Sequence, residues 1–305
     1  MSRVAAVDIG TNTVRLLVAE VSPTPEGPRL AELQRTTRIV RLGEGVDASR
    51  RLADAAMARA LQALAAYGEA TAGWGCDAVR AVATSAVRDA TNGDTFLARA
   101  TDTLGVRPEL ISGEEEAALG FAGATMLAQG PAPHLVIDPG GGSTEMVMGE
   151  GSPTFAESVD IGSVRLTERL LSRLPATADD LEAARRHVDE LLAAQVALPE
   201  APGTVIGVGG TYTTLGAVHL DLDTSSAAAV DGAVVPVEAL RGVTDRLARL
   251  TVDEIAAIPS VPALRAPVLL GGAVVAERAA LFSGAATVTI SEHDILDGVV
   301  LSLYP

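Results

Sequence analysis

An apolar run at residues 134–137 leads into an aspartate and a glycine-rich turn, and a second apolar run follows Glu145. This pattern predicts a strand, a tight turn and a second strand. Glycine has no side chain, so backbone N–H groups in the turn can approach an anion closely, and the hydroxyls that follow add further donors. We therefore expect the turn to bind a phosphate through Gly140, Gly141, Gly142, Ser143 and Thr144.

Two carboxylates flank this turn. Asp138 stands at the end of the first strand and Glu145 at the start of the second. Both can only accept hydrogen bonds, so they would repel a bound phosphate unless a hard cation lay between them. The stretch thus predicts a site for Mg²⁺, or alternatively Mn²⁺, beside a phosphate. A glycine-rich hairpin with incidental acids is the simpler alternative, because isolated glycine motifs are weak signals.

A second copy of the same pattern lies near the N-terminus. Residues 4–20 again contain an apolar run, an Asp-x-Gly step, small hydroxylated residues and another apolar run. A chain whose halves begin with the same strand, phosphate turn and strand is typical of a duplicated α/β fold with a ligand between its halves. In the first half, the residues expected to bind this phosphoanion are Gly10, Thr11, Asn12 and Thr13.

Four motifs, taken together and in this order, resemble those of the exopolyphosphatase / guanosine pentaphosphate phosphohydrolase (Ppx/GppA) family. They are Asp8-Ile-Gly-Thr-Asn-Thr, Ile111-Ser-Gly-Glu-Glu-Glu-Ala117, Asp138-Pro-Gly-Gly-Gly-Ser-Thr-Glu145 and Gly207-Val-Gly-Gly-Thr211. The similarity runs over nearly the whole chain, from Val4 to about Leu301. It implies an α/β fold of two actin-like (ribonuclease H-like) domains with a central inter-domain cleft, in the actin-like, sugar kinase and Hsp70 ATPase superfamily.

The resemblance also implies an activity. It indicates a phosphoric anhydride hydrolase, an exopolyphosphatase that releases terminal orthophosphate from linear inorganic polyphosphate by Mg-assisted direct attack of water. The resemblance also implies pppGpp as a second substrate and a homodimeric state. Many members have a further C-terminal helical region, whereas this sequence shows the two-domain core, so we expect a preference for short chains. A sugar- or acetate-type kinase and a non-catalytic polyphosphate or nucleotide sensor are the alternatives.

Three consecutive glutamates begin a predicted helix at residues 113–127. Acids at a helix N-terminus complement the helix dipole, but three exceed what capping requires. Because neighbouring helix positions differ by about 100°, only one of them can point squarely into a given site. Like charges nearby raise the pKa of a carboxylate, which suits a general base. The family pattern implies that this base is Glu116, with Glu115 as the alternative.

An arginine one turn into another predicted helix is a candidate for a further phosphate contact. The hydroxyls of Thr84 and Ser85 stand at a strand end before Arg88, whose guanidinium matches phosphate oxygens. A helix cap followed by a surface arginine is the alternative. The resemblance implies phosphate contacts for Ser85 and Arg88, and also for Asp8, Arg15, Gly209, Gly210, Thr211 and Arg265. For the two later glycines, a requirement of close packing is the alternative.

The net charge of −16 restricts the partners. The long-range field would repel a polyanion, so polyphosphate binding must depend on local donors and the metal. The same charge argues against nucleic acid. No apolar run reaches the roughly 18 residues of a membrane span, and no basic segment precedes an apolar leader, so we expect a cytoplasmic protein without membrane contact. The single cysteine excludes an internal disulfide, and the four histidines show no metal-binding spacing.

Glycine and prolines at residues 130–133 indicate a domain boundary. We expect an N-terminal actin-like domain at 1–128, a C-terminal one at 129–293, and a last helix at about 294–305 that packs back on the first. Apolar periodicity predicts further helices at 48–72, 162–171, 177–197, 236–250 and 251–258. Whether Arg35, Arg38 and Arg41 contact polyphosphate or form a solvated charge run stays open at this point.

Overall fold

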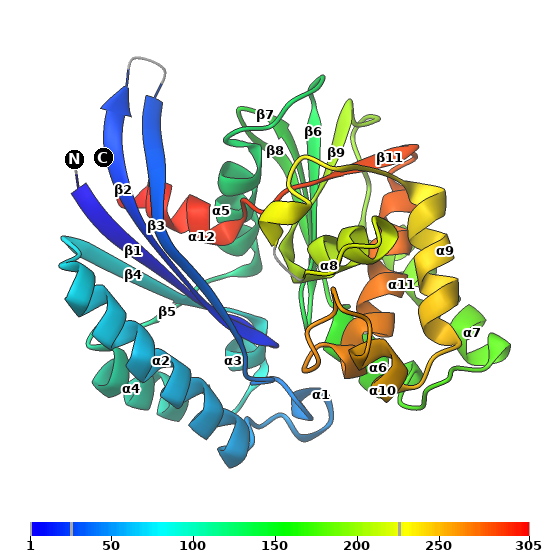
Figure 1. Ribbon diagram of the computed structural model, residues 1–305, viewed down its shortest axis with the longest axis horizontal. Helices are drawn as coiled ribbons and strands as arrows, with labels where there is room; N and C mark the ends of the chain where they lie inside the picture. The colour runs from blue at the N-terminus through cyan, green and yellow to red at the C-terminus, as the bar shows by residue number, and fades with distance from the viewer. Residues whose placement is uncertain (1, 25–26, 225–226, 305) are drawn as a thin grey trace. The chain divides into compact units, whose positions relative to one another are not determined.

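Residues 2–24, 27–224 and 227–304 are described by the computed structural model (Figure 1). The chain divides into two units, Met1–Gly123 with Ile295–Pro305, and Ala124–Asp294. The last helix therefore belongs to the first unit. The limits of two actin-like domains at 1–128 and 129–293 stay a prediction.

The first unit is built on a sheet of five strands within the described residues, in the order β3-β2-β1-β4-β5. The strands are β1 (Ser2–Ile9), β2 (Thr13–Thr24), β3 (Gly27–Ile39), β4 (Ala78–Ala83) and β5 (Glu109–Leu110). The first three pair antiparallel, whereas β1, β4 and β5 pair parallel. The predicted strand, turn and strand at 4–20 is confirmed as β1 and β2.

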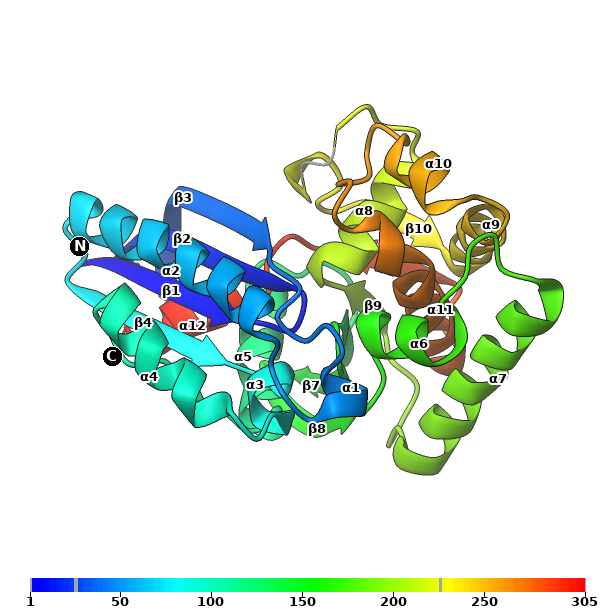
Figure 2. The ribbon, with the colours of Figure 1, turned by 90° about the horizontal axis from the view of Figure 1, so that it is seen from below.

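A core lies on each face of this sheet, and alternate residues of a strand contribute to opposite cores. The helices of the unit are α1 (Val46–Ser49), α2 (Asp54–Trp74), α3 (Ser85–Asp89), α4 (Gly93–Leu104), α5 (Gly113–Thr125) and α12 (Ile295–Ser302). Val7 belongs to the core shared with α2 and α4, whereas its neighbour Ala6 belongs to the core shared with α12. Figures 1 and 2 show α2 and α4 on one face of the sheet and α12 on the other.

The predicted helix at 48–72 is confirmed from Asp54 on, as α2, but its start is wrong, because α1 ends at Ser49 and residues 50–53 are not helical. After α1 the backbone of Arg50 turns left-handed, with φ of 53°. The side chain of Asn92 then takes both backbone groups of Leu52: its Oδ1 accepts the N–H at 2.9 Å and its Nδ2 donates to the carbonyl at 3.0 Å. These backbone groups are thus bonded to a distant side chain rather than within a helix.

The second unit repeats the strand order of the first. Its strands are β6 (His134–Pro139), β7 (Thr144–Glu150), β8 (Ser152–Val159), β9 (Thr204–Gly207), β10 (Val234–Pro236) and β11 (Thr287–Ile290), in the order β10-β11-β9-β6-β7-β8. From the β8 end, the sheet has the same sequence of antiparallel and parallel pairs as the first sheet, with β10 added at the far edge. The predicted duplicated α/β fold is confirmed.

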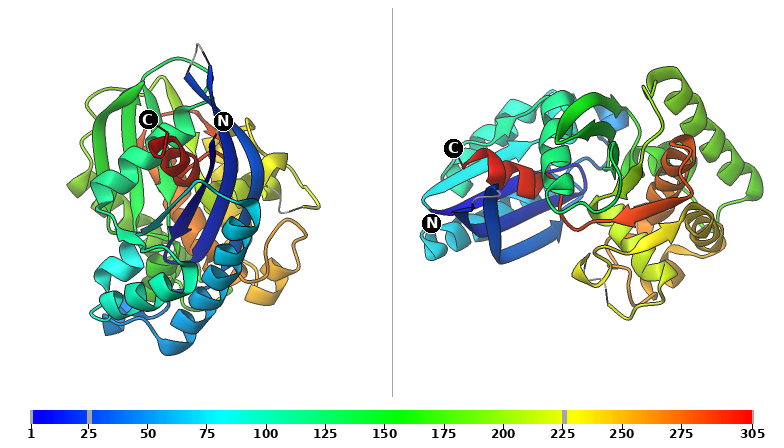
Figure 3. Two further views of the ribbon diagram at one scale, coloured as in Figure 1. Left: turned by 90° about the vertical axis from the view of Figure 1, so that its left-hand side faces the viewer. Right: turned by 90° about the horizontal axis from the view of Figure 1, so that it is seen from above.

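The helices of the second unit cover this sheet (Figure 3). They are α6 (Ser163–Leu170), α7 (Ala178–Gln195), α8 (Gly209–His219), α9 (Val237–Ala248), α10 (Val252–Ala256) and α11 (Ala266–Phe282), with a short 3₁₀ turn, η1 (Ala227–Ala229). The predicted capping pair before α7 is present, since Thr177 and Asp180 form a reciprocal capping box. Over the part of the chain that is described, no helix combines the length and the hydropathy needed to cross a membrane.

Candidate active site

The turn between β1 and β2 is closed and braced by its own backbone. The N–H of Gly10 donates to the carbonyl of Thr13 at 2.9 Å, and the carbonyl of Asn12 accepts two N–H groups from residues 40–41. The carbonyl of Thr11 accepts a further N–H, from Gly43, at 2.8 Å. The segment after β3 therefore fixes the shape of the loop that is predicted to bind phosphate.

A buried ion pair lies at the base of this loop. Asp8 and Arg15 are opposite each other in the β1–β2 register, and both Nε and Nη2 of Arg15 donate to Oδ2 of Asp8, at 2.9 and 2.7 Å. The carboxylate has no donor of its own, so it could face a phosphate only through a cation or water. The structure thus brings these two predicted site residues together, and their contact with phosphate stays a prediction.

The first phosphate loop also meets the start of α3. The hydroxyls of Thr11 and Ser85 lie 2.8 Å apart and are buried, so two predicted phosphate contacts from separate segments form one hydrogen-bonded pair. Arg88 lies at the other end of the same short helix, α3. Its Nη1 donates to the carbonyl of Ile111 at 3.0 Å, which connects the arginine to a residue two positions before the glutamate-rich helix.

The three glutamates of α5 have different surroundings. Glu114 and Glu115 are exposed, whereas the side chain of Glu116 is only 14% exposed. Its Oε2 lies 3.5 Å from Nη1 of Arg88. Glu115 instead accepts a hydrogen bond from Arg80 at 2.7 Å. Of the two candidate bases, Glu116 is thus the one that lies beside a predicted phosphate-binding arginine.

In the second unit, the turn at 140–144 is held against the start of α6. The N–H of Gly140 donates to the carbonyl of Ser143 at 2.9 Å, as Gly10 does to Thr13 in the first unit. The carbonyls of Gly140 and Gly141 accept N–H groups from residues 163–165 at 2.9 to 3.1 Å. The backbone of Gly162 packs so closely on the turn that a Cβ there would lie 2.5 Å from the backbone of Gly141, so this position requires a glycine. The hydroxyl of Thr144 donates to Ile161.

The two predicted metal ligands are cross-strand neighbours. Asp138 of β6 is paired with Glu145 of β7, so their side chains project from the same face of the sheet. Glu145 is buried, and its Oε1 accepts a hydrogen bond from Ser158 at 2.8 Å. Burial raises the pKa of Tyr212, and the negative charge of Asp138 raises it further. Two adjacent carboxylates with only oxygen donors fit a hard cation such as Mg²⁺ or Mn²⁺.

A second glycine turn, at the start of α8, adjoins these acids. Gly209 has φ of 76°, and a Cβ there would lie 2.6 Å from Oδ1 of Asp138. A Cβ on Gly210 would collide with the guanidinium of Arg265. Thr211 donates to the carbonyl of Pro139 at 3.2 Å. Both glycines are thus closely packed against predicted site residues, and their own contact with phosphate stays a prediction.

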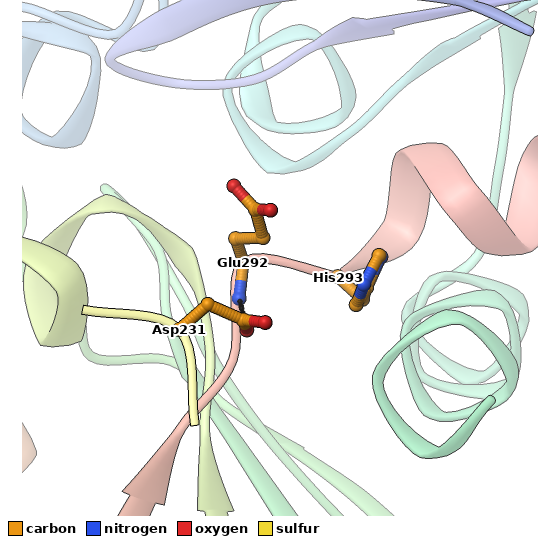
Figure 4. Close-up of side chains that lie close together, drawn as sticks. All are labelled: Asp231, Glu292 and His293. Atoms are coloured by element: carbon orange, nitrogen blue, oxygen red, sulfur yellow. Dashed lines mark hydrogen bonds between the residues drawn. The ribbon is translucent and has the colours of Figure 1, made fainter. Parts of the chain in front are cut away.

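The sequence analysis missed a second group of possible ligands. Ligand atoms of Asp231, Glu292 and His293 all lie within 4.8 Å of one another (Figure 4). The residues come from the turn before β10 and the segment after β11, and the N–H of Glu292 donates to Oδ1 of Asp231 at 2.9 Å. Since the two segments are far apart in sequence, no local spacing indicated this group.

Two of the three arginines after Leu33, Arg35 and Arg38, contact groups of the first unit. Arg35 pairs with Glu32 and with the buried Asp297 of α12, at 2.7 and 2.9 Å. The guanidinium of Arg38 lies 6.0 Å from the centre of the Tyr67 ring. Arg35 therefore fixes the last helix to the sheet, and the solvated-charge explanation does not apply to it.

The fold and these turns define an α/β protein made of two copies of one unit, each with a glycine turn beside an aspartate. The chain belongs to the Ppx/GppA phosphatase family, which matches residues 18–305. It is 44% identical over 315 residues to Exopolyphosphatase 2 of Mycobacterium tuberculosis (strain CDC 1551 / Oshkosh), with 99% of both chains covered. This confirms the family indicated by the four motifs.

Solved structures agree with this assignment. The chain is similar to a crystal structure of an exopolyphosphatase-like protein, with a TM-score of 0.92, 37% identity, and coverage of 99% of this chain and 98% of that one. It is also similar to the Aquifex aeolicus PPX-GPPA enzyme, with a TM-score of 0.83, 28% identity and 99% of both chains covered.

Proposed function

We propose that this protein is an exopolyphosphatase that releases terminal orthophosphate from linear inorganic polyphosphate. One observation supports this most: in the second unit, Asp138 and Glu145 lie beside two glycine turns and Arg265. This is the set of groups that a phosphoanhydride and a hard cation require. The relative named Exopolyphosphatase 2, which matches over its whole length, supports the choice of polyphosphate as the substrate.

The reaction needs a base, an anion cradle and compensation of charge. Glu116 orients the attacking water and takes its proton, and Arg88 stabilises the charge that moves to the leaving oxygen. The proposed phosphate contacts are the loop at 10–13 with Ser85 in the first unit, and the loop at 140–144 with residues 209–211 in the second. Asp138 and Glu145 would hold a Mg²⁺ or Mn²⁺ ion, which would supply polarisation of the phosphoryl oxygens and neutralisation of their charge. Water attacks phosphorus directly, so no covalent intermediate with the protein is formed.

The partners follow from the charge and the family. With a net charge of −16, the protein binds polyphosphate through local donors, and it has no nucleic acid partner. The protein acts as a cytoplasmic homodimer, a state that size-exclusion chromatography with light scattering would test.

The experiment is an assay of phosphate release with Mg²⁺, from short polyphosphate, long polyphosphate, pppGpp and ATP. The proposal predicts release from polyphosphate, faster from short chains. Faster release from pppGpp would make pentaphosphate hydrolysis the main activity. Binding of polyphosphate without any release would favour the non-catalytic sensor, and ATP consumption that requires an acceptor would favour the kinase.

A further inference from the structure

Arg80 joins four elements of the first unit at one point. It lies on β4, and its side chain is 16% exposed. Its Nη2 donates to Oε1 of Glu115 on α5 at 2.7 Å and to Oε2 of Glu109 on β5 at 2.8 Å. Its Nη1 donates to the hydroxyl of Ser302 on α12 at 2.8 Å. One guanidinium thus links the sheet to the helix that contains the proposed base and to the last helix.

The contact with Glu115 restricts the first turn of α5. Side chains of consecutive helix residues differ in direction by about 100°, so a first turn anchored through Glu115 cannot rotate without moving Glu116. Glu115 points to Arg80, and Glu116 lies beside Arg88 at 3.5 Å. The two arginines therefore hold adjacent glutamates in different directions.

The body of α5 is fixed by a second contact. A Cβ on Gly298 of α12 would collide with the carbonyl of Leu119 on α5, so the backbones of the two helices touch there. Ser302, which accepts the hydrogen bond from Arg80, belongs to the same helix as Gly298. With its middle held by α12 and its first turn held by Arg80, α5 has little freedom to change the position of Glu116.

We propose that Arg80 is a positioning residue for the proposed hydrolysis: through Glu115 it sets the direction of the Glu116 carboxylate. The inference depends on the proposed function, since it assigns a role relative to the Glu116 base. It also explains how one base is selected from three adjacent glutamates. Arg80 neutralises Glu115 and keeps it directed away from Arg88, which leaves Glu116 as the carboxylate beside the phosphate-binding arginine.

The chain offers a matched control for this role. Glu109 accepts two hydrogen bonds from Arg80, from Nη2 at 2.8 Å and from Nε at 3.1 Å, and Glu115 accepts one from the same Nη2 at 2.7 Å. Their side chains are similarly exposed, at 54% and 47%. Only Glu115 belongs to α5. Glu109→Gln and Glu115→Gln therefore remove the same charge from the same arginine, but only the second releases the helix.

The test measures kcat and KM for polyphosphate separately in Glu109→Gln, Glu115→Gln, Arg80→Ala, Arg80→Lys and the double variant Arg80→Ala/Glu115→Gln. A misplaced catalytic group lowers the rate, so we expect kcat to fall about tenfold in Glu115→Gln and in Arg80→Ala, with KM within about twofold. Glu109→Gln should keep kcat within about twofold. The double variant should be no slower than either single variant, because both break one link. Arg80→Lys should recover part of the rate.

Equal losses in Glu109→Gln and Glu115→Gln would overturn the proposal, because Arg80 would then act only on stability. Additive losses in the double variant would also overturn the proposal. Unchanged kcat in Glu115→Gln would overturn it as well, and this variant should fold normally because the Glu115 side chain is half exposed. If the wild type releases phosphate and Glu116→Gln does not, the proposed function stands. The Arg80 variants then test the positioning role alone. A wild type without release from any substrate refutes both.

Discussion

Replacing Glu116 by glutamine should abolish most of the activity with little effect on folding. Glutamine has nearly the same shape, so the packing beside Arg88 is preserved while the proton acceptor is lost. A lost general base lowers rates by about 100-fold or more, which corresponds to about 2.7 kcal/mol of transition-state stabilisation. The lost ion pair is partly exposed and 3.5 Å long, so its contribution to folding should be at most about 1 kcal/mol.

The assay is the rate of phosphate release from short polyphosphate at saturating Mg²⁺, with thermal melting measured in parallel. Glu114→Gln is the matched control, since it removes a charge from the same helix turn at an exposed position and should stay within about twofold of the wild type. Undiminished release by Glu116→Gln would refute its role as the base. A loss of at least about 100-fold in Glu115→Gln instead would transfer the role to Glu115.

Three further predictions concern the metal, a glycine and a buried tyrosine. Asp138→Asn should raise the Mg²⁺ concentration needed for half-maximal activity at least about tenfold. The same shift in Glu292→Gln, and not in Asp138→Asn, would place the catalytic ion at the group of Asp231, Glu292 and His293. Gly209→Ala should lose activity, because the backbone there has φ of 76° and a Cβ would lie 2.6 Å from Asp138. Gly284→Ala has a similar φ of 74° but open space around the Cβ, so it should keep its activity and only lower the free energy of unfolding in urea, by roughly 1–2 kcal/mol of backbone strain. Burial raises the pKa of Tyr67 from 10.0 to about 12. The contribution of the buried neutral Tyr67 to the free energy of unfolding is therefore fully present below pH 10 and declines as the pH rises through about 12. Tyr67→Phe should remove that decline when unfolding in urea is measured at alkaline pH.

Much of the fold could be predicted because its signals are local. The apolar runs around the glycine turns became β1, β2, β6 and β7, and the periodic segments after residue 112 became helices close to their expected limits. These patterns depend on the periods of strands and helices, which are visible in any short window of sequence. The repeated strand order follows from the repeated motif.

The error at 48–72 had a long-range cause. The alanine-rich segment has good helix propensity throughout, yet Asn92 binds the backbone of Leu52 from 40 positions away in the chain. Helix propensity is a weak preference that such a contact overrides. The amphipathic α4, which begins next to Asn92, was not predicted either, although Phe96, Leu97 and Ala100 form its buried face.

The surroundings of the candidate site also depended on distant contacts. The motifs named the phosphate turns, but their bracing by residues 40–43 and 163–165 joins segments that share no local pattern. The group of Asp231, Glu292 and His293 likewise exists only because two remote segments meet. The roles predicted for the phosphate and metal ligands stay predictions that the proposed variants test.

The amino-acid sequence by itself determined the two phosphate-turn hairpins, the duplicated α/β class and the family, because periodicity and glycine placement act over a few residues. Only the tertiary structure shows how the surroundings of Glu115 and Glu116 differ. No local sequence rule distinguishes three adjacent glutamates. They differ because Arg80, 35 positions before Glu115, donates a hydrogen bond to Glu115, while Arg88 lies beside Glu116. The direction of a side chain on a helix is set by what the fold brings against each face of that helix.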